Sequence, residues 1–368
     1  MRNRILKLAA LLALVTVTAY GPAAVQVTGA VETAASLTSI GPLTFSPDGV
    51  LYAADPLAAS VYAFDLGAQA SGSAAGTANV AGLDQKLAAM LGTAANEIQI
   101  ADLAVHPKSH NSFVAVMRGQ GAAAKPALFR VDGAGKIDLI AADSLKGTSV
   151  ALPNPPAAPA AGATGRNNRS QSITKLAYAN GRVWVAGLSN EEFASKLWSV
   201  AYPFTKADTG TSVEIYHGNH QQLETRSPVY AFVPYTINNQ PYIIGAYLCT
   251  PLVKFPVGSL TPGQKFRGTT IAELGAGNRP IDMILYQKNG KEFLLMSNTS
   301  RGVMKIPTAD FGSASPITAP VTAETAGIAY EKITSMTGIQ QLDKLDATHS
   351  IVIAQANGGM NLTAVDLP

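Results

Sequence analysis

The sequence predicts an all-β protein, a six-bladed β-propeller with one short inserted helix, and two observations carry this prediction. First, one pattern recurs six times: a short apolar strand, a turn and a second apolar strand, often followed by a third. The turn is Ser46-Pro-Asp-Gly49 in the first copy and Asn180-Gly181 in the third, and both are strong hairpin signals. Second, the copies recur roughly every 55 residues, which gives room for four short strands and their turns.

Each of these units must stack on another, because a small sheet cannot bury its own apolar faces. Radial stacking around an axis also protects the edges of the sheets. A pair of stacked sheets would use similar strands, but the regular period favours the propeller. We expect a single propeller over residues 37–368. Its blades are predicted near residues 37–80, 98–145, 172–218, 227–275, 279–320 and 325–368.

Two inserts interrupt the period. Residues 83–92 have the apolar spacing of a helix, and we expect a short helix there, packed on the propeller. The predicted apolar face of this helix consists of Leu83, Leu87, Met90 and Leu91. Residues 151–170 are rich in Pro, Ala and Gly, and they predict a surface loop because blade-like units continue on both sides of them.

The first residues have the pattern of an export signal. Basic residues are followed by a short apolar run from Leu8 to Val17. We therefore expect a signal peptide and mature N-terminal tail over residues 1–30, and a periplasmic or secreted protein. An uncleaved membrane anchor is the alternative. No later stretch is long and apolar enough to predict a membrane-spanning helix.

The charge balance gives no support for a nucleic-acid partner. Arg2, Arg4 and Lys7 lie in the expected signal and account for three of the 27 basic residues, which leaves 24 against 24 acidic residues. No basic stripe with interleaved aromatic residues is present. Cys249 is the single cysteine and cannot form an internal disulfide, so stability must come from sheet packing. We expect a monomer.

The hairpin units resemble a known group of propellers. The Ser46-Pro-Asp-Gly49 turn before Val50-Leu-Tyr-Ala-Ala54, and Asn180-Gly181 before Arg182-Val-Trp-Val185, are similar to the blades of the NHL/SMP-30/TolB-like six-bladed propellers. The resemblance covers the repeat pattern and implies the fold superfamily. Lactonases of the SMP-30 type hold a divalent ion with acidic and amide ligands in the central channel. Their motif has no residue-by-residue match in this chain.

The alignment of the units predicts a site at the mouth of the central channel. One residue of each inner strand is expected there, namely Pro42, Asp102, Lys175, Tyr230, Asp282 and Ser335. With the units in sequence order around the ring, Asp102 and Asp282 would face each other, with Lys175 and Tyr230 between them. Two carboxylates and an amine can hold a cation or a polar ligand. The alternative is that each Asp accepts hydrogen bonds from the backbone of a neighbouring blade.

Two arginines precede inner strands of adjacent units. Arg226 and Arg279 stand just ahead of the strands of the fourth and fifth units. An arginine at the channel mouth can bind a carboxylate or a phosphate of a ligand. The alternative is that these arginines tie neighbouring blades together through backbone carbonyls.

A histidine-rich segment predicts a second, metal-binding site. His217 and His220 are three residues apart, and Glu224 offers a carboxylate nearby. Cys249 is a further soft ligand for copper or zinc if the fold brings it to the histidines. The alternatives are a polar surface loop with ordinary histidines, and a buried Cys249 thiol that packs as a small hydrophobe in an apolar strand.

These features predict a binding module that takes a small molecule or a protein at the channel mouth of one face. Two other functions stay open: a metal-dependent hydrolase of the lactonase or esterase kind, and a redox accessory protein that holds copper or zinc. An enzyme is the less favoured interpretation, because the sequence lacks a Gly-x-Ser-x-Gly elbow, a phosphate-binding glycine loop and a haem-attachment motif. The one cofactor for which the sequence offers candidate ligands is a divalent metal ion.

Overall fold

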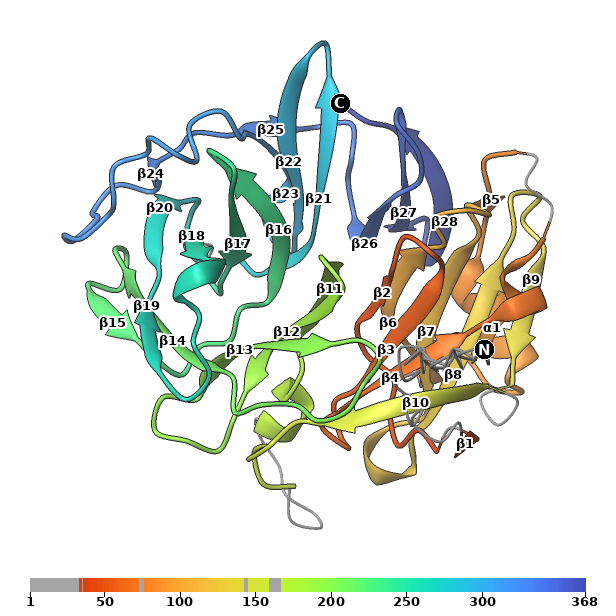
Figure 1. The fold of residues 1–368 in the computed structure, drawn as a ribbon. Helices are drawn as coiled ribbons and strands as arrows, with labels where there is room; N and C mark the ends of the chain where they lie inside the picture. The colour runs from red at the N-terminus through yellow and green to blue at the C-terminus, as the bar shows by residue number, and fades with distance from the viewer. Residues whose placement is uncertain (1–32, 35, 73–75, 142–144, 159–166, 250) are drawn as a thin grey trace, which may run out of the picture.

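The computed structural model describes residues 33–34, 36–72, 76–141, 145–158, 167–249 and 251–368. In this part of the chain, six small sheets surround a central axis, so the predicted six-bladed propeller is confirmed (Figure 1). The expected export signal over residues 1–30 lies outside the described residues. No helix among the described residues has the length and apolar character needed to cross a membrane.

The blades are numbered here by the order of their innermost strands in the chain. Blade 1 contains, from inside to outside, β2 (Leu43–Phe45), β3 (Val50–Asp55), β4 (Ser60–Asp65), β10 (Lys146–Ala151) and β1 (Thr33–Ala34). Blade 2 contains β6 (Ile98–Val105), β7 (Ser112–Arg118), β8 (Lys125–Val131) and β9 (Ile137–Ile140). Blade 3 contains β11 (Lys175–Ala179), β12 (Arg182–Leu188), β13 (Ser195–Ala201), β14 (Thr211–His217) and β15 (Gln222–Glu224), with β19 (Lys265–Arg267) parallel to β14.

The remaining blades follow the same plan. Blade 4 contains β16 (Ala231–Ile237), β17 (Gln240–Ala246), β18 (Pro251–Pro256), β20 (Thr269–Glu273) and β24 (Ala326–Gly327). Blade 5 contains β21 (Pro280–Lys288), β22 (Lys291–Asn298), β23 (Gly302–Pro307) and β25 (Glu331–Ile333). Blade 6 contains β26 (Ile339–Lys344), β27 (His349–Ala356), β28 (Gly359–Asp366) and β5 (Asn79–Val80).

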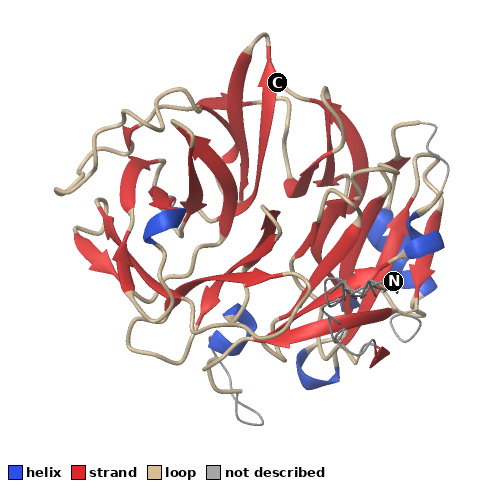
Figure 2. Cartoon of the chain, in the orientation of Figure 1, coloured by secondary structure: helices blue, strands red, loops and turns tan. Residues whose placement is uncertain are grey.

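Helices are few and short, as Figure 2 shows. The α-helix α1 (Leu83–Met90) confirms the predicted insert. Leu83 and Leu87 are buried against blades 2 and 6, but Met90 is exposed, so the predicted apolar face is narrower than expected. The 3-10 helices among the described residues are η1 (Gly67–Ala70), η2 (Ala95–Glu97), η3 (Gly121–Ala123), η5 (Asn168–Gln171) and η6 (Val257–Ser259).

The turns form as the sequence predicts. Gly49 has φ of 100° and donates its N–H to the Ser46 carbonyl, which closes the hairpin between β2 and β3. Asn180 and Gly181 have φ of 53° and 73°, the two positive values that a type I′ turn requires between β11 and β12.

The blades do not follow one another around the axis in sequence order. Among the innermost strands, β2 contacts both β6 and β11, and β6 also contacts β26. The ring therefore runs through blades 1, 3, 4, 5, 6 and 2 and back to blade 1 (Figure 1). The expectation that blades 2 and 5 lie opposite each other is wrong, because both are neighbours of blade 6.

Two outer strands explain this order. From blade 1 the chain reaches β5, which pairs with β28 of blade 6, and continues through α1 into blade 2. It then returns through β10, which pairs with β4 of blade 1, before entering blade 3. Strand β5 thus completes blade 6, and strand β10 completes blade 1, although the partner strands lie far away in the sequence. The pairing of β5 with β28, the last strand of the chain, ties blade 6 to the segment that connects blades 1 and 2.

The core consists of six apolar clusters, and each lies between two neighbouring blades of the described structure. Trp198 and Phe204 of blade 3, for example, share a cluster with Tyr52 and Val61 of blade 1. Burying one large apolar side chain of this kind contributes about 1.5–3 kcal/mol. Stacking of the blades on each other is therefore what stabilises the fold.

The sixth unit differs from its predicted alignment. Ile333 belongs to β25, the outer strand of blade 5, and the inner strand of blade 6 is β26, which begins at Ile339. Ser335 is therefore not at the inner strand. The register irregularity at Ile339/Gln341 corresponds to the one at Ile100/Asp102, so Gln341 takes the place that Ser335 was expected to have.

Candidate functional site

Three of the predicted site residues meet near the axis. The ammonium group of Lys175 in β11 lies 3.1 Å from Asp102 Oδ1 in β6, and it also forms a very short ion pair with Asp282 Oδ1 in β21. The side chains of Lys175, Asp102 and Asp282 are only 15%, 4% and 2% exposed. The lysine thus joins three blades that alternate around the ring, instead of standing between two opposite blades.

The same carboxylates also bind the backbone of the next blade. Asp102 Oδ2 accepts the N–H of Leu43 in blade 1 at 2.7 Å, and Asp282 Oδ2 accepts the N–H of Leu342 in blade 6 at 2.9 Å. The backbone interaction and the lysine contact therefore exist together. Both oxygens of each carboxylate have partners, which makes this cluster a structural link between blades.

Burial and the neighbouring charges shift the pKa values of Lys175 and Asp102 in opposite directions. Burial alone would lower the pKa of Lys175, but Asp102 and Asp282 outweigh it and hold that pKa well above its usual range. Burial raises the pKa of Asp102 to about 6, although Lys175 and the Leu43 N–H act to lower it. Lys175 therefore stays charged at every physiological pH.

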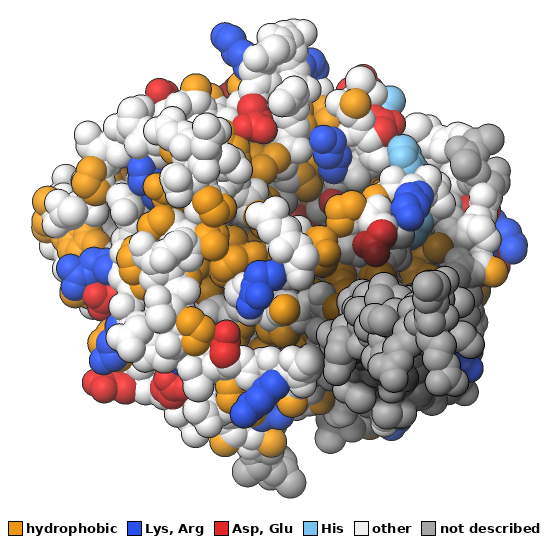
Figure 3. Space-filling view, in the orientation of Figure 1, with side chains coloured by type: hydrophobic (Ala, Val, Ile, Leu, Met, Phe, Trp, Pro, Cys, Tyr) orange, Lys and Arg blue, Asp and Glu red, His pale blue; other side chains and the backbone are white. Residues whose placement is uncertain are grey.

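The ion cluster lies at one end of a central cavity of about 630 Å³. The walls are mostly apolar and come from the inner strands and the turns that follow them. Figure 3 shows a hollow near the middle of this face, with hydrophobic side chains around it. Residues that line the cavity include Leu43, Phe45, Leu103, Tyr178, Phe232, Val233, Met283 and Leu342, with Lys175 and Asp282 among them.

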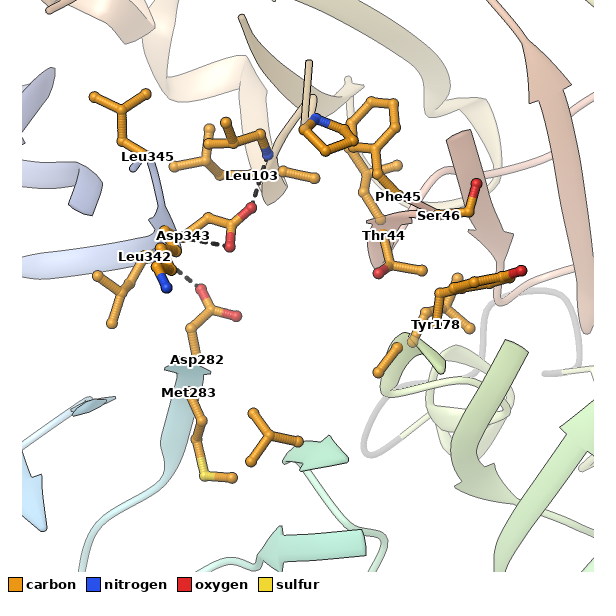
Figure 4. A pocket seen from close by; sticks show the side chains of 18 of the residues that line it. Thr44, Phe45, Ser46, Leu103, Tyr178, Asp282, Met283, Leu342, Asp343 and Leu345 are labelled. Carbon is orange, nitrogen blue, oxygen red and sulfur yellow. Dashed lines mark hydrogen bonds between the residues drawn. The ribbon is translucent and has the colours of Figure 1, made fainter. Parts of the chain in front are cut away.

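A carboxylate that the sequence analysis missed also lines this cavity. Asp343 in β26 points into the opening beside Asp282, and Thr44 lies across from them (Figure 4). Asp343 Oδ2 accepts the N–H of Val105 in blade 2 at 2.7 Å. Burial raises the pKa of Asp343 to about 7, although hydrogen bonds from Val105 and Lys344 act to lower it.

The other predicted ligand-binding residues do not line the cavity. The Tyr230 hydroxyl lies 3.2 Å from Gln171 Oε1, and the Arg279 guanidinium stacks over the Tyr230 ring at 5.5 Å. Arg226 is exposed, and its Nε donates to the Glu192 carbonyl at 3.4 Å. Arg226 thus links the loop between β12 and β13 of blade 3 to the connection into blade 4 through a backbone carbonyl.

The histidine segment forms a compact cluster at the rim of blade 3. Nδ1 of His217 lies 3.0 Å from Glu224 Oε1, and Nδ1 of His220 lies 2.6 Å from the same oxygen. The two imidazole centroids are 3.7 Å apart. Burial would raise the pKa of Glu224, but the two histidines outweigh it and lower that pKa to about 2. One ligand atom from each residue lies within 4.8 Å of the others, a spacing suitable for a metal ion.

Cys249 is not part of this cluster. It lies in a turn after β17, with φ of 60°, and its N–H donates to the Asn278 carbonyl at 2.7 Å. The thiol is partly exposed, so the expectation of a buried thiol within an apolar strand is wrong. The strand ends at Ala246, and the positive φ at Cys249 reverses the chain toward β18.

The rim cluster has a fourth member that the sequence analysis missed. Glu273, the last residue of β20, is fully buried, and its Oε2 lies 3.6 Å from His217 Nε2. Its other oxygen accepts the Gly218 N–H at 2.6 Å. A carboxylate at the end of an apolar strand, two residues after Ile271, was the signal in the sequence, because such a strand is expected to be buried.

No family model matches this chain, and no curated protein matches it. Solved structures similar to it include the apo form of the soluble aldose sugar dehydrogenase from Escherichia coli, with 10% identity, a TM-score of 0.36, and coverage of 90% of this chain and 97% of that chain. A proposed oxidoreductase (glucose dehydrogenase) from Thermus thermophilus has 12% identity, a TM-score of 0.36, and coverage of 91% and 98%.

A third similar structure is the PQQ-bound form of an aldose sugar dehydrogenase from Streptomyces coelicolor, with 10% identity, a TM-score of 0.28, and coverage of 92% and 98%. At such identities and scores, these similarities carry no argument about activity. The fold of this chain is a six-bladed propeller on the evidence of its own sheets.

Proposed function

We propose that this protein binds a small molecule in the central cavity. The observation that carries this proposal is one concave site that has apolar walls and a charged end. Its volume of about 630 Å³ lies in the range of small-molecule sites, which are mostly apolar with a few polar groups that fix orientation. A concave site of this depth favours a small molecule over a protein docked on the face.

The charges favour a ligand with a cationic or hydrogen-bond-donating head. The charged lining residues are Lys175 and Lys344 against Asp282, Asp343 and Asp346, and Asp102 adds a further carboxylate beside Lys175. Asp343 stands apart from the ion pairs and borders the cavity. A cationic head beside Asp343 would favour its charged form and lower its pKa. The apolar body of the ligand would then lie against Leu103 and Met283.

Binding is favoured over metal-dependent hydrolysis in this cavity. Lys175 lies between Asp102 and Asp282, so an ammonium group occupies the place where a metal ion would need these two carboxylates. Within the described chain, the residues spaced to hold a metal are those at the rim of blade 3. A copper redox role for Cys249 has no support either, because its thiol is not grouped with the histidines there.

Three matched probes test the proposal: phenethylamine, phenethyl alcohol and phenylacetate. Calorimetry should give the tightest binding for the amine and the weakest for the carboxylate. Asp343→Asn should remove most of this preference, because the asparagine keeps the size of the side chain and loses its charge. Equal binding of all three probes, or a preference for the carboxylate, would contradict a cationic head group.

A cavity-filling variant shows whether the probes bind in the channel. Thr44→Trp places a large side chain in the opening and should abolish binding of all three probes. Leu139→Trp is the matched control, because Leu139 is exposed on the outer strand β9. Binding that survives Thr44→Trp unchanged would place the ligand elsewhere and overturn the proposal.

We also propose that the protein is exported and belongs to the NHL/SMP-30/TolB-like superfamily of propellers. The basic start and short apolar run support export, and the Pro-Asp-Gly hairpin supports the superfamily. Sequencing the N-terminus of the protein from its native host tests the first point. A mature chain that begins with Met1 would contradict cleavage.

A further inference from the structure

The rim cluster contains buried polar atoms that lack a hydrogen-bond partner. His217 is fully buried between two carboxylates, with Nδ1 facing Glu224 and Nε2 facing Glu273. Within the described part of the chain, His217 Nε2 and Glu273 Oε2 are buried and have no hydrogen-bond partner. Buried polar atoms are almost always paired, because leaving one unpaired costs about 1–3 kcal/mol.

A neutral His217 cannot satisfy both carboxylates. If Nδ1 carries the proton, it donates to Glu224, and the lone pair of Nε2 then faces Glu273 Oε2. If Nε2 carries the proton, the lone pair of Nδ1 faces Glu224 instead. His220 also directs its Nδ1 to Glu224, so two Nδ1 atoms and one carboxylate oxygen converge on one point.

We propose that His217, His220 and Glu224 bind a zinc ion, with Glu273 as the residue that orients His217. The lone pair of each Nδ1 and one oxygen of Glu224 would be the ligands, and water would occupy the open fourth position. His217 Nε2 would then carry its proton, and a small shortening of the present 3.6 Å would let it donate a hydrogen bond to Glu273 Oε2. One ion therefore gives both unpaired atoms a partner.

The charges and the chemistry of these residues fit zinc. Two neutral imidazoles and one carboxylate form a known zinc ligand set, and a carboxylate behind a ligating histidine is the usual second layer of such sites. The charges of Glu224 and Glu273 would balance the two positive charges of the ion. Imidazole ligands also favour zinc over calcium, which prefers sets made only of oxygen atoms.

The local fold prepares the three ligands. His217 ends β14, Glu224 ends β15, and His220 lies in the turn between these two strands. The pairing of His217 with Gln222 sets the register of the hairpin, and Gln221 has φ of 58°, which allows the tight reversal. Tetrahedral zinc holds its ligand atoms about 3.4 Å apart. The present distances of 3.0 and 2.6 Å would widen slightly, and His220, 40% exposed, is free to move.

A metal titration of the full-length protein tests the proposal. Protein stripped with a chelator should bind one equivalent of Zn²⁺ in competition with a chromophoric chelator, and zinc should raise its melting temperature. His220→Ala should abolish this binding. The exposed position of His220 should leave the fold intact, which circular dichroism checks. Glu273→Gln should weaken zinc binding by about 10–100-fold, as loss of a second-layer partner does.

Two variants serve as matched controls. His349→Ala removes a surface histidine that also lies between two carboxylates, those of Asp346 and Asp366. Cys249→Ser removes the thiol. Both should keep one equivalent of zinc at unchanged affinity. Failure of the wild-type protein to bind zinc would overturn the proposal and indicate that a proton on His217 or on Glu273 pairs the two buried atoms. Unchanged binding in His220→Ala would overturn it as well.

Discussion

The central cluster and the rim cluster both bury charged side chains, but they differ in how their atoms are paired. Around Lys175, each carboxylate oxygen of Asp102 and Asp282 has a partner in the protein. Around His217, two buried atoms lie 3.6 Å apart and have no hydrogen-bond partner among the described residues. A cluster whose buried atoms are all paired needs no further partner, whereas buried atoms without a partner require an explanation, and a bound ion is the one we propose. The difference separates a structural role from a binding role.

The largest effect should come from removing the centre of the complete cluster. Lys175→Met leaves Asp102 and Asp282 buried without their cation, and we expect a loss of about 3–5 kcal/mol in the free energy of unfolding. Urea denaturation followed by fluorescence measures it. Lys136→Met is the control, because Lys136 pairs with Asp138 at the surface and should change stability by at most about 1 kcal/mol. Equal effects of the two variants would show that the central cluster is not a stabilising link.

A matched pair of carboxylate variants compares the two clusters directly. In metal-free protein, Asp282→Asn weakens the ion pair with Lys175 and should lower stability by about 2 kcal/mol. Glu273→Gln should cost less than Asp282→Asn, since its amide oxygen can still accept the Gly218 N–H, as Glu273 Oε1 does now, and its amide N–H can donate to His217 Nε2. Chemical denaturation in the presence of chelator gives both values. A larger loss for Glu273→Gln would contradict the contrast between the clusters.

A further effect should come from pH. Burial raises the pKa of Asp102 to about 6 and of Asp343 to about 7, both above the ordinary value of 3.8. Above about pH 4 the unfolded chain has released the protons of these two carboxyl groups, whereas the folded protein holds them up to about pH 6 to 7. The free energy of unfolding should therefore fall as pH rises from about 4 to about 7. Melting temperatures across this range measure the fall, and Asp343→Asn should reduce it. Stability that rises over the same range would contradict these assignments.

Much of the fold was predictable because its signals are local. The Pro-Asp-Gly turn before Val50 and the Asn180-Gly181 turn each identify a hairpin, and the helical spacing from Leu83 identifies α1. The order of the blades around the ring was not predictable. It depends on β5 and β10, two strands whose partners lie far away in the sequence, and no local pattern identifies such pairs.

The candidate sites also divide into those that a local sequence pattern predicts and those that only contacts between distant segments create. His217, His220 and Glu224 lie in one hairpin, so their sequence spacing predicted their grouping. Asp343 was missed because it lies two residues beyond Gln341, the position that a correct alignment of the sixth unit would select. Glu273 was missed because only the packing of blade 4 against blade 3 brings it to His217. Sites that depend on contacts between blades need the structure.

Anomalous diffraction at the zinc edge, from crystals of the full-length protein grown with Zn²⁺, tests the contrast between the clusters most directly. We expect one peak between His217, His220 and Glu224, and none beside Lys175, where the ammonium group already lies between the carboxylates. A peak at Lys175, or no peak at the rim, would contradict the account.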